Sequence, residues 1–177
     1  MSGGFTHDNV ANKTVDWYTP AYVVDTLRQC GAHFTLDPCA PVGGVPWLNM
    51  PKSYSLHEDG LAQSWACESV WLNPPYGRNT PAWLEKLMAS MKDGANGIAL
   101  VFARTDCGWF HDATKVASGI LFLKGRIKFV DGLGMTAGNG AGAGSMLIAY
   151  GAGNAAVLEQ AAQTEALSGL FVGLEGY

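Results

Sequence analysis

Short apolar runs that alternate with longer amphipathic segments constrain the fold of this chain more than any other feature. Each run ends in polar or turn-forming residues, as where Val70-Trp71-Leu72 is followed by Asn73-Pro74-Pro75-Tyr76. Apolar runs of this length are typical of buried strands, and segments with apolar residues at helical spacing are typical of helices that cover a sheet. The alternation predicts an α/β domain with a mostly parallel, twisted sheet and helices on both faces.

The same pattern gives the expected elements and their ends. The expected strands are 34–37, 70–73, 98–103, 120–123, 126–130 and 146–150. The expected helices are 20–30, 81–92, 109–116 and 155–167. We expect Thr19, Thr80 and Asn154 to be N-caps, because their side-chain oxygens can accept hydrogen bonds from free helix N–H groups. Gly31 and Gly169 are expected to end the first and last helices.

The length and composition are those of a single globular domain. A chain of 177 residues with 48% hydrophobic residues can bury a sizeable core. We expect residues 1–15 to be a flexible N-terminal arm, residues 16–177 to be one domain, and the glycine-rich segment 131–144 to be a mobile loop.

Several features predict a cytoplasmic protein without a metal. No apolar run is long enough to cross a bilayer, and the N-terminus lacks a signal-peptide pattern. The four cysteines are widely spaced and lack the Cys and His spacing of zinc sites, so we expect reduced thiols and no bound metal. They are Cys30, Cys39, Cys67 and Cys107.

The tetrapeptide Asn73-Pro74-Pro75-Tyr76 places an amide, rigid carbonyls and an aromatic ring at the end of an expected strand, where open α/β sheets bind ligands. An exocyclic aromatic amine such as adenine N6 is a poor nucleophile, because its lone pair is delocalised into the ring. Acceptors at the Asn73 side-chain oxygen and the Pro74 carbonyl can each take one N–H proton and free the lone pair. Tyr76 can stack on an extruded base. The alternative is that the tetrapeptide is only a turn.

The distribution of charge leaves the question of nucleic-acid binding open. A net charge of −4 argues against strong non-specific binding to nucleic acid. However, Lys124, Arg126 and Lys128 alternate and would share one face of a strand, and with Arg78 and Arg104 they can form a DNA-facing surface. The alternative is a solvated strand edge protected by charged side chains.

An ordered series of short motifs runs through most of the chain. The motifs are Trp17-Tyr18-Thr19-Pro20, Leu36-Asp37-Pro38-Cys39-Ala40, Glu58-Asp59-Gly60-Leu61 with Trp65, Trp71-Leu72-Asn73-Pro74-Pro75-Tyr76-Gly77, Trp83, Ala103-Arg104-Thr105-Asp106, Trp109-Phe110-His111 and Lys124-Gly125-Arg126-Ile127-Lys128-Phe129. In this order, from about Trp17 to Tyr150, they resemble the phage-type DNA N-6-adenine methyltransferases. The resemblance implies a Rossmann-like fold, S-adenosylmethionine as cofactor and DNA as substrate, with no separate target-recognition domain.

The resemblance also implies roles for particular residues. The Asn73–Tyr76 loop would be catalytic, and four further segments would bind the cofactor or DNA. Trp17, Thr19 and Pro20 would lie beside the methionine part of the cofactor, Asp37 and Ala40 would hold its amino-acid part, and Asp59 would bind its adenine amino group. Arg126 and Lys128 would meet phosphates, and Phe129 would contact the flipped base; the alternative for Phe129 is core packing. One departure is that the loop after Asp37 has no GxG; Gly43 and Gly44 come late.

The sequence therefore predicts site-specific methylation of adenine N6 in DNA, and leaves other functions open. The same chemistry would serve a methyltransferase that acts on RNA or on a protein glutamine. The thiol of Cys39 suggests a different reaction as an alternative, cytosine C5 methylation, in which a thiolate attacks the ring. The missing GxG suggests another alternative, a catalytically inactive relative that only binds nucleic acid or counters restriction.

Overall fold

The structure, a computed structural model, describes residues 18–131, 133–135 and 142–175. The expected arm at 1–15, Trp17 and much of the glycine-rich loop lie outside the described residues. The expected division into an arm and one domain stays a prediction.

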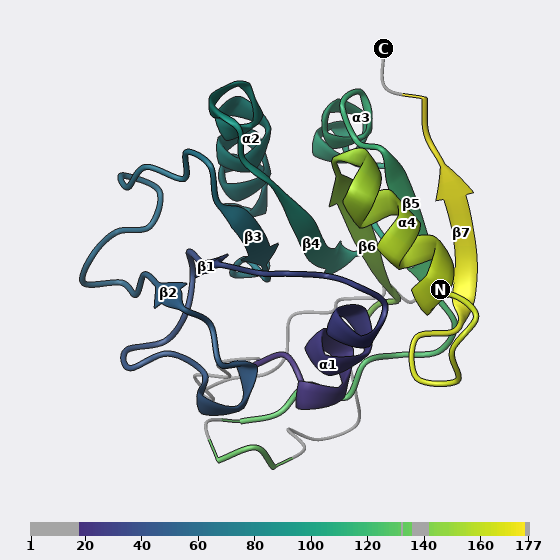
Figure 1. Cartoon of the computed structure of the whole chain (residues 1–177), viewed down its shortest axis with the longest axis horizontal. Helices are drawn as coiled ribbons and strands as arrows, with labels where there is room; N and C mark the ends of the chain where they lie inside the picture. Colours follow the sequence, from purple (N-terminus) through teal and green to yellow (C-terminus); the bar gives the residue numbers. More distant parts are fainter. Residues whose placement is uncertain (1–17, 132, 136–141, 176–177) are drawn as a thin grey trace, which may run out of the picture.

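A mixed sheet forms the centre of the described part of the chain (Figure 1). Across the sheet, its seven strands are β2 (Lys52–Ser53), β1 (Leu36–Asp37), β3 (Ser69–Leu72), β4 (Asn96–Phe102), β6 (Ser145–Tyr150), β5 (Gly119–Leu123) and β7 (Gly169–Gly173). Strands β2, β1, β3 and β4 pair in parallel, whereas β6 pairs antiparallel with both β4 and β5, and β7 pairs antiparallel with β5. The prediction of a mostly parallel sheet is thus confirmed in part: β1 to β5 share one direction, but half of the sheet is joined by antiparallel pairs.

Helices cover both faces of the sheet, as predicted. Helices α1 (Ala21–Gln29) and α4 (Ala152–Ala161) pack on one face, and α2 (Thr80–Ser90) and α3 (Gly108–Thr114) pack on the other (Figure 1). Successive strand residues point to opposite faces, so Trp71 belongs to the core under α1 and α4, and its neighbours Val70 and Leu72 belong to the other core. Two 3₁₀ turns, Pro46–Leu48 and Met91–Asp93, complete the regular elements.

The predicted N-caps are wrong in each case. Helix α1 begins after Pro20, and the Thr19 side chain makes no capping bond. Helix α2 has Asn79 at its N-cap, so Thr80 is the first helical residue. Asn154 lies inside the first turn of α4, where its amide donates to the Tyr150 carbonyl, 3.0 Å away. A threonine or asparagine near a helix start fits several adjacent positions equally well, and local tertiary partners decide among them.

One strand prediction and one helix prediction are also wrong. Residues 126–130 form no strand; only Val130 makes an isolated antiparallel bridge, to Tyr18. Helix α4 ends at Ala161 rather than at 167, and Gly169 begins strand β7. A Cβ at Gly169 would lie 2.1 Å from the Phe122 carbonyl oxygen, so this glycine permits close strand pairing rather than ending a helix.

No helix in the described ranges combines the length and the apolar character needed to cross a membrane.

Candidate active site

A cavity of about 830 Å³ lies where β1, β3 and β4 end and their loops begin. Because Leu36 pairs with Val70 in parallel register, the segments that follow β1 and β3 leave the sheet side by side. This volume is within the range of small-molecule sites. The topology therefore brings two motifs that are distant in sequence to one hollow.

Many of the predicted site residues line this cavity. They are Thr19, Asp37, Ala40, Asp59, Asn73, Pro74, Pro75 and Tyr76. Other predicted residues are not among the residues that line it. They are Pro20, Arg78, Arg104, Lys124, Arg126, Lys128 and Phe129.

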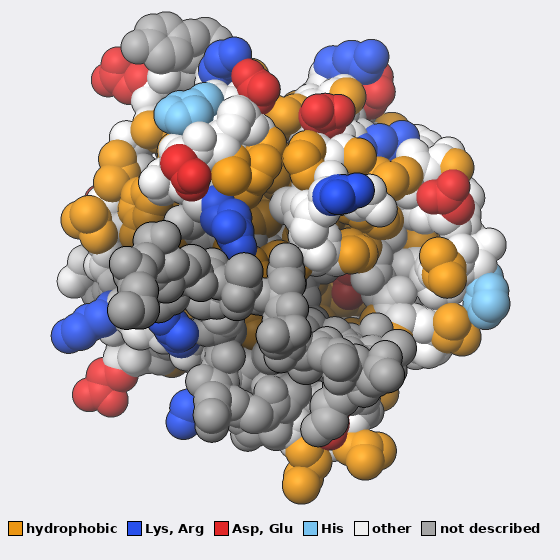
Figure 2. All heavy atoms as spheres, turned by 180° about the vertical axis from the view of Figure 1, so that it is seen from behind, with side chains coloured by type: hydrophobic (Ala, Val, Ile, Leu, Met, Phe, Trp, Pro, Cys, Tyr) orange, Lys and Arg blue, Asp and Glu red, His pale blue; other side chains and the backbone are white. Residues whose placement is uncertain are grey.

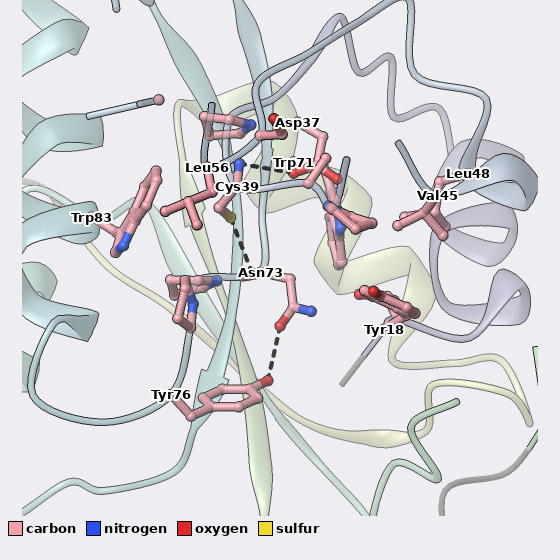
Figure 3. A pocket seen from close by; sticks show the side chains of 18 of the residues that line it. Tyr18, Asp37, Cys39, Val45, Leu48, Leu56, Trp71, Asn73, Tyr76 and Trp83 are labelled. Atoms are coloured by element: carbon pink, nitrogen blue, oxygen red, sulfur yellow. Dashed lines mark hydrogen bonds between the residues drawn. The ribbon is translucent and has the colours of Figure 1, made fainter. Parts of the chain in front are cut away.

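The Asn73 amide is oriented by Tyr76. The Tyr76 hydroxyl donates a hydrogen bond to Asn73 Oδ1 at 3.0 Å, and Figure 3 shows Asn73 lying between Cys39 and Tyr76. Burial raises the pKa of the Tyr76 phenol, so it stays protonated and remains a donor. This bond fixes the orientation of Asn73 Oδ1, a hydrogen-bond acceptor on the cavity wall.

The loop after Asn73 is also held from the helix side. The Thr80 hydroxyl donates to the Pro75 carbonyl at 3.0 Å and accepts from the Gly77 N–H at 3.1 Å. The hydroxyl predicted to cap helix α2 therefore closes the Asn73–Tyr76 loop. Together with two prolines, these bonds fix the backbone carbonyls of the loop.

The surroundings of Tyr76 bear on two aromatic predictions. Its ring is stacked on Phe102, with centroids 4.0 Å apart and an interplanar angle of 10°, so one ring face is already covered. Stacking of Tyr76 on a base stays a prediction for the other face. Phe129 is 1% exposed and meets Tyr76 edge-on at 5.7 Å. This ring packs in the core, which is the alternative given above, and its contact with a flipped base stays a prediction.

Asp37 and Cys39 connect the first loop to the second. The Cys39 N–H donates to Asp37 Oδ1 at 3.2 Å, and the Cys39 thiol donates to the Asn73 carbonyl at 3.1 Å (Figure 3). Burial raises the pKa of the Asp37 carboxyl to about 7, although the Cys39 hydrogen bonds oppose this rise. Burial and the neighbouring Asp37 raise the pKa of the Cys39 thiol. A protonated thiol bonded to a carbonyl is a poor nucleophile, which argues against cytosine C5 chemistry.

The turn at Asp59-Gly60 is locked against the first loop. A Cβ at Gly60 would lie 1.9 Å from the Pro38 carbonyl oxygen, so only glycine allows this approach. The Trp65 indole N–H donates to the Gly60 carbonyl at 2.8 Å, and its ring stacks on Trp83 at 6.2 Å. Asp59 itself has a left-handed backbone with φ 51° and an exposed side chain at the cavity wall.

The exposed cations predicted to meet DNA lie outside the cavity. Lys124, Arg126 and Lys128, here called the basic row, are all exposed, as are Arg78 and Arg104. The segment that carries the basic row continues into Val130, which pairs with Tyr18 of the cavity wall. On the face seen in Figure 2, basic and acidic side chains are interspersed over the described surface. DNA contacts by these cations stay a prediction.

Sequence reasoning missed several residues of the cavity wall. They are Tyr18, Trp71, Trp83 and Phe102, together with Cys39 as a structural link. Each of these residues lies in or beside one of the motifs quoted above or an apolar run. Its residue type therefore fits core packing as well as ligand binding. A search of the described residues for clusters of at least three His, Cys, Asp or Glu side chains that could hold a metal finds none.

Comparison with known families decides the relationship. A family model described as DNA N-6-adenine-methyltransferase (Dam) matches residues 7–159, most of the chain. The chain belongs to this family. The suspected relationship is thereby confirmed, and the family name indicates a transferase that methylates adenine N6 in DNA. Searches of curated proteins and of solved structures give no match.

Proposed function

We propose that the protein transfers a methyl group from S-adenosylmethionine to adenine N6 at specific sites in DNA. This proposal rests on the Asn73 amide at the start of the loop after β3. Tyr76 orients this amide, which lines a cavity of ligand size. The family match supplies the expected reaction class. Adenine would have to leave the duplex stack to reach this cavity.

The Asn73 and Pro74 oxygens act on the amino group of the target base. Asn73 Oδ1 is oriented by the Tyr76 bond, and the Pro74 carbonyl is held by the proline ring and by the Cys39 bond to the preceding carbonyl. Each oxygen accepts one N–H of the amino group, and both stabilise the positive charge that develops on N6 as its lone pair attacks. Because both acceptors are fixed before the base arrives, little reorganisation is needed.

The residues of the cavity fit S-adenosylmethionine, which supplies an electrophilic methyl group when bound. The buried Thr19 hydroxyl lines the cavity without a hydrogen-bond partner in the described part of the chain, so it is available to a ligand. Asp37, when ionised, can pair with the ammonium of the amino-acid part, beside Ala40. Asp59 lies on the same wall and can accept from the adenine amino group of the cofactor. Phosphates would be met by the basic row, Arg78 and Arg104.

The direct test is transfer of label from tritiated S-adenosylmethionine to separate pools of DNA, RNA and protein. We expect label in DNA, recovered as N6-methyladenine. The Asn73→Ala variant should lose transfer and keep cofactor binding. Asn79→Ala is the matched control, because Asn79 is exposed and its side chain makes no cap bond to helix α2.

Each other outcome identifies a different function. Label in RNA or in protein glutamine would move the chemistry to another substrate, and 5-methylcytosine would make Cys39 the nucleophile. DNA binding without cofactor binding would mark an inactive relative. Turnover of Asn73→Ala equal to that of Asn79→Ala would refute the mechanism.

A further inference from the structure

Trp71 carries a buried hydrogen-bond donor that the mechanism above does not use. Its indole Nε1 has no partner in the ranges that the structure describes, although the residue is 0% exposed. Leaving a buried donor unpaired costs about 1–3 kcal/mol, and native proteins leave few such groups. Phenylalanine at this position would carry no unpaired donor. We therefore expect the indole N–H to bind a group that is not part of the folded core.

The position of Trp71 places its side chain on the cavity wall. Trp71 lies on β3 two residues before Asn73, and it contributes to the cavity wall. Its ring is fixed by an edge contact with Phe34, with centroids 5.5 Å apart. In Figure 3, Trp71 lies toward the same side of Asn73 as Tyr18, away from Trp83. The Thr19 hydroxyl, next to Tyr18 in the chain, is the other buried, unpartnered side chain that lines the cavity.

Two other indoles, the half-buried Trp47 and the buried Trp65, are satisfied by the protein itself. Trp47 donates to the Thr19 carbonyl at 2.9 Å, and Trp65 donates to the Gly60 carbonyl at 2.8 Å. Among the described residues, carbonyl acceptors thus lie opposite these two indoles and none lies opposite Trp71. The lack of a described partner for the Trp71 N–H is therefore particular to this part of the cavity wall and is not shared by Trp47 and Trp65.

The chemistry of the two free groups limits what they bind. An indole N–H only donates, and a threonine hydroxyl can also donate, so together they require a group that accepts. In S-adenosylmethionine the carboxylate is the anionic group, and it accepts without donating. We propose that the Trp71 N–H, together with the Thr19 hydroxyl, binds the carboxylate of the cofactor, while Asp37 faces its ammonium. This inference rests on the proposed function, since it concerns the same cofactor.

The test is the Trp71→Phe variant, which removes the N–H and keeps the aromatic ring. We expect calorimetry to show about tenfold weaker binding of S-adenosylhomocysteine, as for loss of one hydrogen bond to a charged group. Because phenylalanine is smaller than tryptophan, the unliganded variant should melt at a lower temperature but stay folded at the temperature of the assay. Tyr150→Phe is the matched control, because Tyr150 also has a buried hydroxyl without a described partner but is not part of the cavity wall. It should leave binding unchanged.

A second ligand tests which group is bound. Decarboxylated S-adenosylmethionine should bind the wild-type protein more weakly than S-adenosylmethionine, and Trp71→Phe should not weaken it further. Unchanged S-adenosylhomocysteine binding in Trp71→Phe would overturn the inference while leaving the proposed function intact. Absence of binding to the wild-type protein would instead refute the proposed function.

Discussion

Replacing Asp37 by asparagine is expected to stabilise the protein above neutral pH. The Asp37 carboxyl is 5% exposed, and burial raises its pKa from 3.8 to about 7. Between these two values the folded state keeps a proton that the unfolded state has lost. The free energy of unfolding therefore falls as the pH rises from about 4 to 7, and stays low above that range. At 1.36 kcal/mol per pH unit, the total loss is on the order of 4 kcal/mol.

Asparagine removes this ionisation and keeps an oxygen that can accept the Cys39 N–H. Its unfolding free energy should therefore lack the pH dependence that Asp37 causes. Urea denaturation at pH 4 to 8 measures the difference directly: we expect the two proteins to be similar near pH 4, and Asp37→Asn to be more stable by up to about 4 kcal/mol at pH 8. Asp106→Asn, at an exposed carboxylate outside the cavity, is the control. Parallel stability curves for wild type and Asp37→Asn would refute the reasoning.

The same substitution should damage binding of the cofactor. An ionised Asp37 attracts an ammonium group, so the wild-type affinity for S-adenosylhomocysteine should rise between pH 6 and pH 8 as this carboxyl loses its proton. Asp37→Asn should bind weakly and without this rise. A variant that is more stable and also binds as tightly as the wild type at pH 8 would show that Asp37 does not hold the cofactor.

The remaining predictions concern the loop, the turn and the surface. Tyr76→Phe removes the bond that orients the Asn73 oxygen and should lower kcat about fivefold, with the neutral hydrogen-bond value of about 1 kcal/mol as the guide. Tyr150→Phe should leave kcat unchanged, and equal kcat values for the two variants would contradict this. Gly60→Ala should lower the melting temperature and weaken cofactor binding, because its Cβ collides with the Pro38 carbonyl, whereas Gly153→Ala in helix α4 should be neutral or stabilising. Replacing the basic row with glutamine should weaken DNA binding and flatten its salt dependence without changing cofactor binding; an unchanged salt slope would place the DNA elsewhere.

The Asn73–Tyr76 loop was predictable because its polar and aromatic residues are contiguous. Asn73 to Tyr76 follow an apolar run, so both the strand and its functional end can be inferred from adjacent positions. The central strands were predictable for the same reason: β4 and β6 are buried along most of their length, and their apolar runs have no helical alternative of sufficient length.

The edges of the sheet were not predictable from local pattern. Strand β2 has only two residues, both exposed, so it carries no apolar signal. Strand β7 is bounded by Gly169 and Gly173 and is largely exposed, and glycine is an ordinary signal for the end of an element. Both strands exist because a neighbouring strand offers backbone hydrogen bonds, which is tertiary information.

The links within the site depend on contacts between distant residues. The Cys39 thiol reaches the Asn73 carbonyl across 34 positions of sequence, and Gly60 contacts Pro38 through its backbone. Neither contact changes the local pattern of residue types. That the Trp71 indole has no partner among the described residues likewise follows only from the three-dimensional structure.

Sequencing of modified bases tests the central proposal most directly. The protein and its Asn73→Ala variant would be expressed in a host that lacks adenine methylation, and single-molecule sequencing would report each modified base with its sequence context. We expect N6-methyladenine at a defined recognition sequence with the wild-type protein, and none with Asn73→Ala. Unmodified DNA in cells that contain folded wild-type protein, or equal methylation with the variant, would contradict adenine methylation by the Asn73 loop.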